Sequence, residues 1–473
     1  MLQLNQVSGF YRKVGAMSLS RYMSIGSALL VTIVLTRLLD EEVYGAYRKL
    51  WLIYAILGPV FISSIANTLF YRGKGESRDE AIVANMAIGL LYGLSTGAVA
   101  WLFSPFWSTQ LNVQDLQAGF ALFAPYMAFS VYAGIAEPLF VTINRKKWLI
   151  SYSIAYNTFE AALIVVPFAL GLPIEQVVII MAIGPALRSL FLTALAFKNL
   201  SNGITLSRVF REIPVSLKYG FGLILLSIAG ISATEVDKWV IGSFFESDAL
   251  FAIYVIGAKK IPFIIALTSS VSAALVNEYV NEVRDGNFEG ILREIKKVTA
   301  RLSLIIIPVI ASLFIYAEEV LTILFGQTYS ASAPILRIYM LTVLSQLFFP
   351  QSVSLASGKS GVNAFAGFTE LAVNIVLSII LVMTLGLIGP ALATLVGHFL
   401  FTLILMAYCF KAFGIKPTSF LPDARVRSLW WSLGGVLLTG LVFKHIILWN
   451  WTGLVITGIV CALLVMLSLR KFR

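Results

Sequence analysis

Apolar stretches long enough to cross a bilayer recur along the whole chain and are separated by short polar segments. A membrane-spanning helix needs about 20 consecutive, predominantly apolar residues. We find about 14 such segments, which predicts an all-α, polytopic membrane protein. The predicted spans are residues 14–39, 44–71, 81–103, 116–143, 148–170, 174–199, 213–245, 249–281, 297–326, 331–357, 362–386, 389–414, 427–447 and 451–470.

Composition and charge agree with this class. Hydrophobic residues make up 59% of the chain and charged residues only 12%, whereas soluble domains carry about 25% charged residues. The net charge is +11, but the lysines and arginines occupy alternate loops and form no basic face, so we expect no nucleic-acid partner. Cys409 and Cys461 fall within apolar segments, and we predict neither a disulfide nor a metal site there.

The distribution of basic residues predicts the orientation of the chain. Lysine and arginine fill loops such as 72–78 and 145–147, whereas the intervening loops 104–115 and 171–176 contain neither. Basic residues mark the cytoplasmic loops of membrane proteins. The alternation therefore predicts an even number of spans, with both termini cytoplasmic, in a multi-pass protein of the cell inner (cytoplasmic) membrane.

A weak internal repeat indicates two lobes. The segment "LLDEEVYGAY" (38–47) aligns with "FFESDALFAIY" (244–254) at an offset of about six helices, and a basic pair follows each. We predict an N-terminal lobe over 1–205, a C-terminal lobe over 206–415, and two further helices in 416–473. Transporters built from such repeats hold their substrate between the halves. The alternative is chance similarity between apolar segments of low complexity.

Four segments resemble the polysaccharide-exporter branch of the MOP superfamily. They are "LTRLLDEEVYGAY" (35–47), "DKWVIGSFFESDALFAIYVIGAKKI" (237–261), "LFGQTYSASAPILRIYML" (324–341) and "AVNIVLSIILVMTLGLIGPALATLVGHF" (372–399). The members of this branch are Wzx-type flippases, related to lipid II flippases and MATE exporters. The resemblance implies two pseudo-symmetric six-helix lobes that form a V-shaped cavity, which opens alternately to either side. It also implies export of an oligosaccharide linked to a polyprenyl pyrophosphate, with membrane lipids and a glycan polymerase as further partners of a monomeric chain.

Charged residues inside the predicted spans are candidates for the substrate site. Each costs about 2.5–3.5 kcal/mol at the centre of the bilayer, so each should face protein or a wet cavity. Most are cations, which suits a pyrophosphate, because Arg forks onto phosphate oxygens and Lys supplies a point charge. Guided also by the cavity cations of lipid II flippases, we predict that the pyrophosphate contacts Arg21, Arg48, Lys49, Lys259, Lys260 and Arg337. Arg48 and Lys49 could instead pair with the acidic turn 40–42.

A second set of polar residues predicts an ion-coupling site. Some lipid II flippases build a sodium site from helices 7, 11 and 12. The matching residues here are Asp237, Asn374 and Thr394, with Glu370 one turn before Asn374. We therefore expect Na⁺ or H⁺ as the coupling ion and no other cofactor, although Asp237 could instead form a structural ion pair with Lys238.

The acidic turn that follows the first span is predicted to lie on the outer side of the membrane. Asp40, Glu41 and Glu42 are accordingly interpreted as gate residues or as residues that set the topology, and not as catalysts. The aromatic content of 13% is more easily explained by interfacial belts and core packing than by sugar stacking.

The sequence contains no pattern that indicates catalysis. It has no Gly-rich phosphate loop followed by Lys-Ser/Thr, and no nucleophile, base or metal constellation. We therefore predict a flippase that works by alternating access, and no enzyme. Two alternatives are a MATE-like cation or drug exporter, which should favour carboxylates in its cavity, and a polytopic glycan-assembly enzyme, which should carry a large outer loop.

Overall fold

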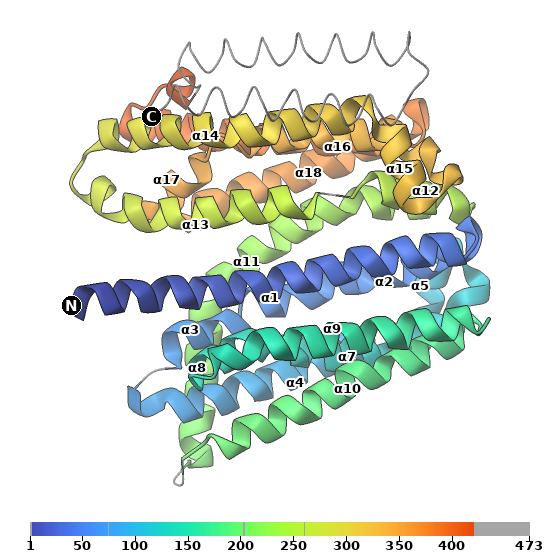
Figure 1. Ribbon diagram of the computed structural model, residues 1–473, viewed down its shortest axis with the longest axis horizontal. Coiled ribbons are helices and arrows are strands. Elements are labelled where there is room, and N and C mark those ends of the chain that lie inside the picture. Colours follow the sequence, from blue (N-terminus) through green and yellow to red (C-terminus); the bar gives the residue numbers. More distant parts are fainter. Residues whose placement is uncertain (1, 74, 202–203, 260, 421–473) are drawn as a thin grey trace. The chain divides into compact units, whose positions relative to one another are not determined.

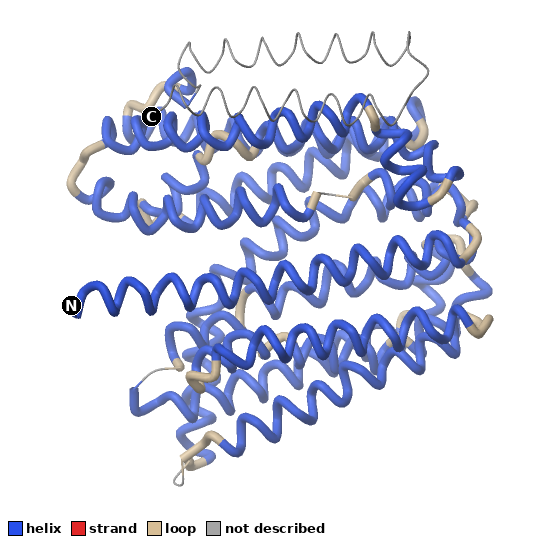
Figure 2. Tube along the Cα trace, viewed as in Figure 1, coloured by secondary structure: helices blue, strands red, loops and turns tan. Residues whose placement is uncertain are grey.

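The computed structural model describes residues 2–73, 75–201, 204–259 and 261–420. Within these ranges every regular element is a helix, and short loops join the helices (Figures 1 and 2). Nine of the described helices are long and apolar enough to span a membrane, or up to eleven if each of two bent pairs is one span. The predicted all-α polytopic class is confirmed. The predicted spans 427–447 and 451–470 lie outside the described residues.

Internal contacts divide the chain into two units, residues 1–252 and 253–473. The seventh predicted span, 213–245, belongs by its contacts to the first unit, because its helix packs against the second and third spans. The division into lobes at residue 205 rests on the internal repeat, and it stays a prediction.

The first unit is a bundle of antiparallel and broken helices (Figure 1). In it α1 packs against α9, α4 against α7, α10 against α7 and α9, and α11 against α2 and α4. These contacts bury apolar faces and leave polar faces of α1, α2 and α9 turned towards the interior. The elements are α1 (Leu2–Leu38), α2 (Glu41–Ser63), α3 (Leu69–Arg72), α4 (Arg78–Leu102), α5 (Ser104–Gln110), α6 (Gln117–Leu122), α7 (Ala124–Ala133), α8 (Ala136–Thr142), α9 (Lys146–Ala169), α10 (Ile174–Lys198) and α11 (Leu206–Phe244), followed by the start of α12 (Asp248–Gly257).

The second unit has the same all-helical construction. Its most extensively packed helix pair is α18 and α19, and α16 and α17 both pack against α19. The remaining elements are α13 (Pro262–Arg284), α14 (Phe288–Ile315), α15 (Ala317–Phe325), α16 (Ala333–Ser345), α17 (Pro350–Ala356), α18 (Ser360–Leu385) and α19 (Ile388–Phe413).

Several predicted spans are broken helices. The span 116–143 is a pair, Gln114–Leu122 and Ala124–Thr142, bent by 41°. Pro125 lies in the first turn of α7, where the missing N–H breaks no hydrogen bond of that helix. The span 331–357 likewise bends by 44° before Pro350, and Pro262 opens α13 after a break within the span 249–281.

The two segments of the internal repeat meet within the first unit. Asp40 caps α2 by accepting a hydrogen bond from the Val43 backbone N–H at 2.8 Å. The Glu42 carboxylate accepts hydrogen bonds from the Ala249 N–H at 3.0 Å and from the Ser247 hydroxyl at 3.2 Å. Gly45 faces the same turn, and a Cβ on it would lie only 1.9 Å from the Asp248 carbonyl oxygen. The start of α2 is therefore held directly against the start of α12.

Lys49 strengthens this contact one turn further along α2. Its side chain is 0% exposed, and its Nζ lies 2.6 Å from Oδ1 of Asp248. The same Nζ donates a hydrogen bond of 2.7 Å to the Leu111 carbonyl and lies 5.7 Å from the centre of the Phe251 ring. One buried cation therefore ties α2 to the end of α5 and to the first turn of α12.

Substitution of Gly45 tests the close approach of α2 and α12. Gly45→Ala places a methyl group against the Asp248 backbone, and such overpacking typically costs about 1–3 kcal/mol. We expect a lower thermal unfolding midpoint for the purified protein in detergent. Gly26→Ala in α1 is the matched control, since nothing lies within 4 Å of its Cβ position. Equal midpoints for the two variants would contradict the packing described.

The Lys49–Asp248 ion pair is tested by a double-mutant cycle. Lys49→Met leaves the Asp248 carboxylate, 17% exposed, without its cation. Removal of one partner of a buried pair costs about 3–5 kcal/mol, so we expect Lys49→Met and Asp248→Asn each to lower the unfolding midpoint clearly. The double variant should be less destabilised than the sum of the two. Strict additivity of the two effects would show that the pair is not coupled.

Candidate functional site

Polar and aromatic residues form stripes on the inner faces of three helices of the first unit. On α9, Tyr152, Tyr156 and Glu160 follow one another at intervals of four residues. Residues three or four apart lie on the same face of a helix. Ser20, Ser24 and Ser27 on α1, and Tyr44, Tyr47 or Arg48, Trp51 and Tyr54 on α2, repeat the pattern.

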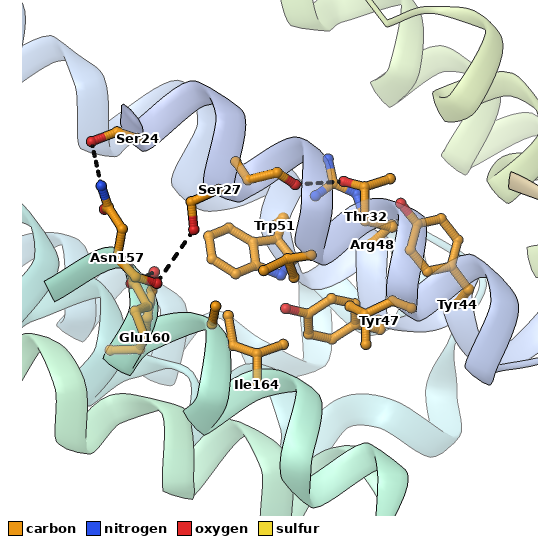
Figure 3. A pocket seen from close by; sticks show the side chains of 15 residues that line it. Ser24, Ser27, Thr32, Tyr44, Tyr47, Arg48, Trp51, Asn157, Glu160 and Ile164 are labelled. Atoms are coloured by element: carbon orange, nitrogen blue, oxygen red, sulfur yellow. Dashed lines mark hydrogen bonds between the residues drawn. The ribbon is translucent and has the colours of Figure 1, made fainter. Parts of the chain in front are cut away.

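These stripes enclose a cavity of about 230 Å³, which we call the narrow cavity (Figure 3). Asn157 donates a hydrogen bond to the Ser24 hydroxyl at 2.9 Å and accepts one from Ser27 at its backbone carbonyl at 3.3 Å. These bonds hold α1 and α9 together at one side of the cavity. The lining residues are Ser24, Ser27, Ala28, Val31, Thr32, Leu35, Tyr44, Tyr47, Arg48, Trp51, Tyr126, Asn157, Glu160, Ala161 and Ile164.

A second cavity of about 650 Å³, the wide cavity, adjoins the first. The two share Ser24, Tyr126 and Glu160 in their walls, so they lie side by side, and together we call them the combined cavity. The wide cavity is lined by Ser20, Arg21, Ser24, Ile25, Tyr54, Ile62, Ser63, Asn67, Tyr126, Ser130, Gly134, Ala136, Glu137, Pro138, Leu149, Tyr152, Ser153, Tyr156, Glu160 and Arg188.

Two of the charged residues in the wide cavity form a bidentate ion pair. The Arg21 Nε and Nη2 atoms donate to Oε2 and Oε1 of Glu137 at 3.0 and 2.7 Å. The Arg21 side chain is 61% exposed in the unit, so this pair can exchange with another anion at low cost.

Tyrosines hold the other two charged residues of the wide cavity. The Tyr126 hydroxyl donates a hydrogen bond to Oε1 of Glu160 at 2.8 Å. The Arg188 Nε donates to the Tyr152 hydroxyl at 2.7 Å, and the Arg188 guanidinium carbon lies 4.2 Å from the centre of the Tyr156 ring. Arg188 and Glu160 form no direct ion pair with any residue that the structure describes.

Arg48 differs from these residues in its hydrogen bonding. Its Nε atom is shielded from solvent and has no hydrogen-bond acceptor among the described residues. Arg48 lies in the wall of the narrow cavity, beside Thr32 and Tyr44 (Figure 3). A buried donor without a partner is costly, and a ligand oxygen in the cavity would satisfy it.

The charges of the combined cavity favour an anionic, hydrogen-bonding ligand. Three arginines (Arg21, Arg48 and Arg188) and two glutamates (Glu137 and Glu160) line it. No group of three or more metal-binding side chains occurs in the part of the chain that the structure describes, so these residues offer no metal centre.

The predicted site residues of the first unit lie in different environments. Arg21 and Arg48 line the cavity, whereas Lys49 lines neither part of it and is sealed against Asp248. The predicted gate residues Asp40, Glu41 and Glu42 belong to the start of α2, where Asp40 and Glu42 make the contacts described above. Asp237 is buried in α11 with the Lys238 ammonium 3.6 Å away.

The remaining predicted residues belong to the second unit. Lys259 follows α12 and is half-buried, and Lys260 lies outside the described residues. Arg337 on α16 donates to the Glu318 carboxylate at 2.8 Å and to the Phe314 carbonyl at 3.0 Å.

The predicted ion-coupling residues of the second unit line the contact between α18 and α19. Asn374 donates to the Thr394 hydroxyl at 3.3 Å, and Oε1 of Glu370 lies 2.6 Å from Nδ1 of His398. The assignments of pyrophosphate, ion and gate residues stay predictions.

The sequence shows Glu160 and Arg188 as charges inside spans, but it does not by itself assign them to a site. The sequence likewise gives no sign that Tyr126, Tyr152 and Tyr156 are more than packing residues. The interval of four residues that joins Tyr152, Tyr156 and Glu160 on α9 is the available signal. It places two tyrosines and one carboxylate on the same face of α9.

Comparisons with known proteins place the fold among membrane transporters. The chain superposes on the lipid II flippase MurJ, in its inward closed conformation, with a TM-score of 0.72 and 16% identity, over 97% of this chain and 98% of that one. The eukaryotic MATE transporter AtDTX14 gives a TM-score of 0.62 and 14% identity, over 86% of this chain and 96% of that one. The predicted resemblance in fold to lipid II flippases and MATE exporters is confirmed.

One sequence relative is the probable low-salt glycan biosynthesis flippase Agl15 of Haloferax volcanii. It is 22% identical over 219 residues, a segment that covers 44% of this chain and 44% of the relative. The matched segment therefore spans less than half the length of that protein.

The family model described as "polysaccharide biosynthesis protein" matches residues 34–334, which is more than half of the chain. The match includes α2, α9 and α10, which supply Arg48, Glu160 and Arg188 to the cavity. The chain is a multi-pass membrane protein that belongs to the polysaccharide biosynthesis protein family.

Proposed function

We propose that the protein is a flippase that moves an oligosaccharide linked to a polyprenyl pyrophosphate across the cytoplasmic membrane by alternating access. Membership of the polysaccharide biosynthesis protein family supports a role in glycan assembly. The flippase named among the relatives and the fold shared with MurJ support transport of a lipid-linked substrate.

The observation that carries this proposal is the unsatisfied donor of Arg48 in a polar cavity among membrane-spanning helices. A bundle of apolar helices gains nothing from enclosing arginines, glutamates and serine hydroxyls unless a polar ligand or water fills the space. Arg48 offers a fork of N–H donors that matches the oxygens of a phosphate. The lipid tail of the substrate stays in the bilayer while its head enters the cavity.

The charges of the cavity distinguish this function from export of cationic drugs. A cation would be attracted by Glu137 and Glu160 but would meet the guanidinium groups of Arg48 and Arg188. Arg21 and Glu137 neutralise each other, so Arg48 and Arg188 outnumber the remaining carboxylate. This balance favours a pyrophosphate over a cation.

The proposal includes an energy source, partners and an orientation. Na⁺ or H⁺ would be the coupling ion, taken up at Asp237, Glu370, Asn374 and Thr394. The chain would act as a monomer, alongside a glycan polymerase that uses the exported lipid, with both termini in the cytoplasm.

Replacement of the gene by variants tests the function and the role of Arg48 together. Cells without the protein should accumulate the lipid-linked glycan in the cytoplasmic leaflet, and the wild-type gene should restore export. Arg48→Ala should reduce export about tenfold or more, because it removes a charged hydrogen-bond donor to phosphate. An impermeant reagent that labels the glycan is applied to intact and to permeabilised cells. The difference in labelling shows which leaflet holds the lipid-linked glycan.

The adjacent cation provides the matched control. Lys49→Met in combination with Asp248→Asn removes a charge of the same sign one residue away, but from a position that lines neither cavity. This double variant should export normally when it is present at the wild-type level. Normal export by Arg48→Ala would remove Arg48 from the site, and normal export without the protein would refute the function.

A further inference from the structure

Tyrosine rings form much of the wall of the wide cavity. Tyr54, Tyr126, Tyr152 and Tyr156 come from three different helices and all line it. A tyrosine ring offers an apolar face and a polar tip, so it can contact C–H groups and donate or accept a hydrogen bond at the same time. These tyrosines therefore pack against one another and also line the cavity.

Hydrogen-bonding groups lie between the rings. Glu160 accepts one bond from Tyr126, and a carboxylate has capacity for several more. Arg188 uses its Nε towards Tyr152, and the guanidinium carries further N–H donors. The Ser130 hydroxyl is buried in the same wall, close to the Tyr54 side chain. Donors and acceptors therefore occur side by side around one space.

This combination of tyrosine rings, donors and acceptors matches a sugar better than it matches the polyprenyl tail or the pyrophosphate of the proposed substrate. A polyprenyl tail has no groups that could bond to Glu160, Arg188 or Ser130. The wide cavity offers a pyrophosphate no net attraction, because two arginines (Arg21 and Arg188) and two glutamates (Glu137 and Glu160) line it. A pyranose ring presents hydroxyl groups at its edge and C–H groups on its faces. It can therefore satisfy the carboxylate and the guanidinium while it lies against tyrosine rings.

We infer that the wide cavity is a sugar-binding subsite, which holds the sugar next to the pyrophosphate while Arg48 binds a phosphate in the narrow cavity. The inference rests on the proposed function and assigns one part of the substrate to each of the two cavities. The shared walls at Ser24, Tyr126 and Glu160 place the two subsites next to each other, as a sugar bonded directly to a phosphate requires. A volume of about 650 Å³ lies within the range of small-molecule sites, about 300–1,000 Å³.

The test compares two lipids on the purified, full-length protein in detergent. The probes are a bare polyprenyl diphosphate and the glycan-bearing polyprenyl diphosphate extracted from cells that lack the protein. Dissociation constants are measured by quenching of tryptophan fluorescence, to which Trp51 in the narrow cavity contributes, and by native mass spectrometry. The wild type should bind the glycan-bearing lipid about tenfold more tightly or better, since a sugar adds hydrogen bonds to charged groups.

The cavity variants should remove this preference. Glu160→Gln and Tyr156→Ala should each bring the two dissociation constants together. Tyr156→Ala should also leave that of the bare lipid unchanged, because Tyr156 lines only the wide cavity, whereas Glu160 lines both. Arg48→Ala should weaken the binding of both lipids. Tyr132→Phe is the control, because Tyr132 bonds to Thr193 at 2.6 Å and lines neither cavity.

The possible results separate the two proposals. If the wild type prefers the glycan-bearing lipid and Glu160→Gln keeps that full preference, the sugar subsite is wrong although the flippase proposal stands. Equal binding of both lipids by the wild type would likewise overturn the sugar subsite alone. If the wild type binds neither lipid, the proposed function itself fails. Glu160→Gln preserves side-chain shape, so it decides the question even if Tyr156→Ala does not fold.

Discussion

A charge within the hydrocarbon layer must meet an opposite charge, a hydrogen-bonding partner or a polar cavity, and this requirement organises the first unit. Each unsatisfied charge costs about 2.5–3.5 kcal/mol at the centre of the bilayer. The structure meets the requirement in three ways. Arg21 forms a bidentate ion pair with Glu137. Lys49 is enclosed by Asp248 and the Leu111 carbonyl, and Arg188 lies among tyrosines. Arg48 alone among these four cations has a buried donor without an acceptor in the described structure. That exception is what makes the cavity a candidate for binding.

The neighbouring residues Arg48 and Lys49 show how one turn of helix serves two purposes. Successive residues on a helix point about 100° apart, so the two cations cannot share an environment. Lys49 turns towards α5 and α12 and stabilises the contact between the two repeat segments. Arg48 lies beside Thr32 of α1 and lines the narrow cavity (Figure 3). Lys49 therefore belongs to the helix contact, whereas Arg48 supplies the donor that we assign to the substrate.

The sequence was sufficient to predict the membrane class, most spans and the positions of the interior charges, because these depend on local composition. It could not predict how each charge is satisfied. The partner of Lys49 includes a backbone carbonyl 62 residues away, and the acidic turn that seemed its natural partner bonds instead to the start of α12. The helix breaks at Pro125 and Pro350 split spans that hydropathy joins. The cavity depends on three helices meeting along polar faces, which periodicity within one helix only suggests.

Movement of the lipid-linked glycan between leaflets by the purified protein is the central claim, and it can be measured in vesicles. The glycan-bearing polyprenyl diphosphate is reconstituted with or without the protein, and impermeant periodate oxidises the sugars that face outward. Without protein, the lipid in the inner leaflet should stay protected. With protein, that protected fraction should become oxidised over time, and heat-denatured protein should leave it protected. If active, correctly folded protein leaves the inner-leaflet lipid as protected as empty vesicles do, under an imposed Na⁺ or H⁺ gradient as well as without one, the protein is not a flippase for this substrate.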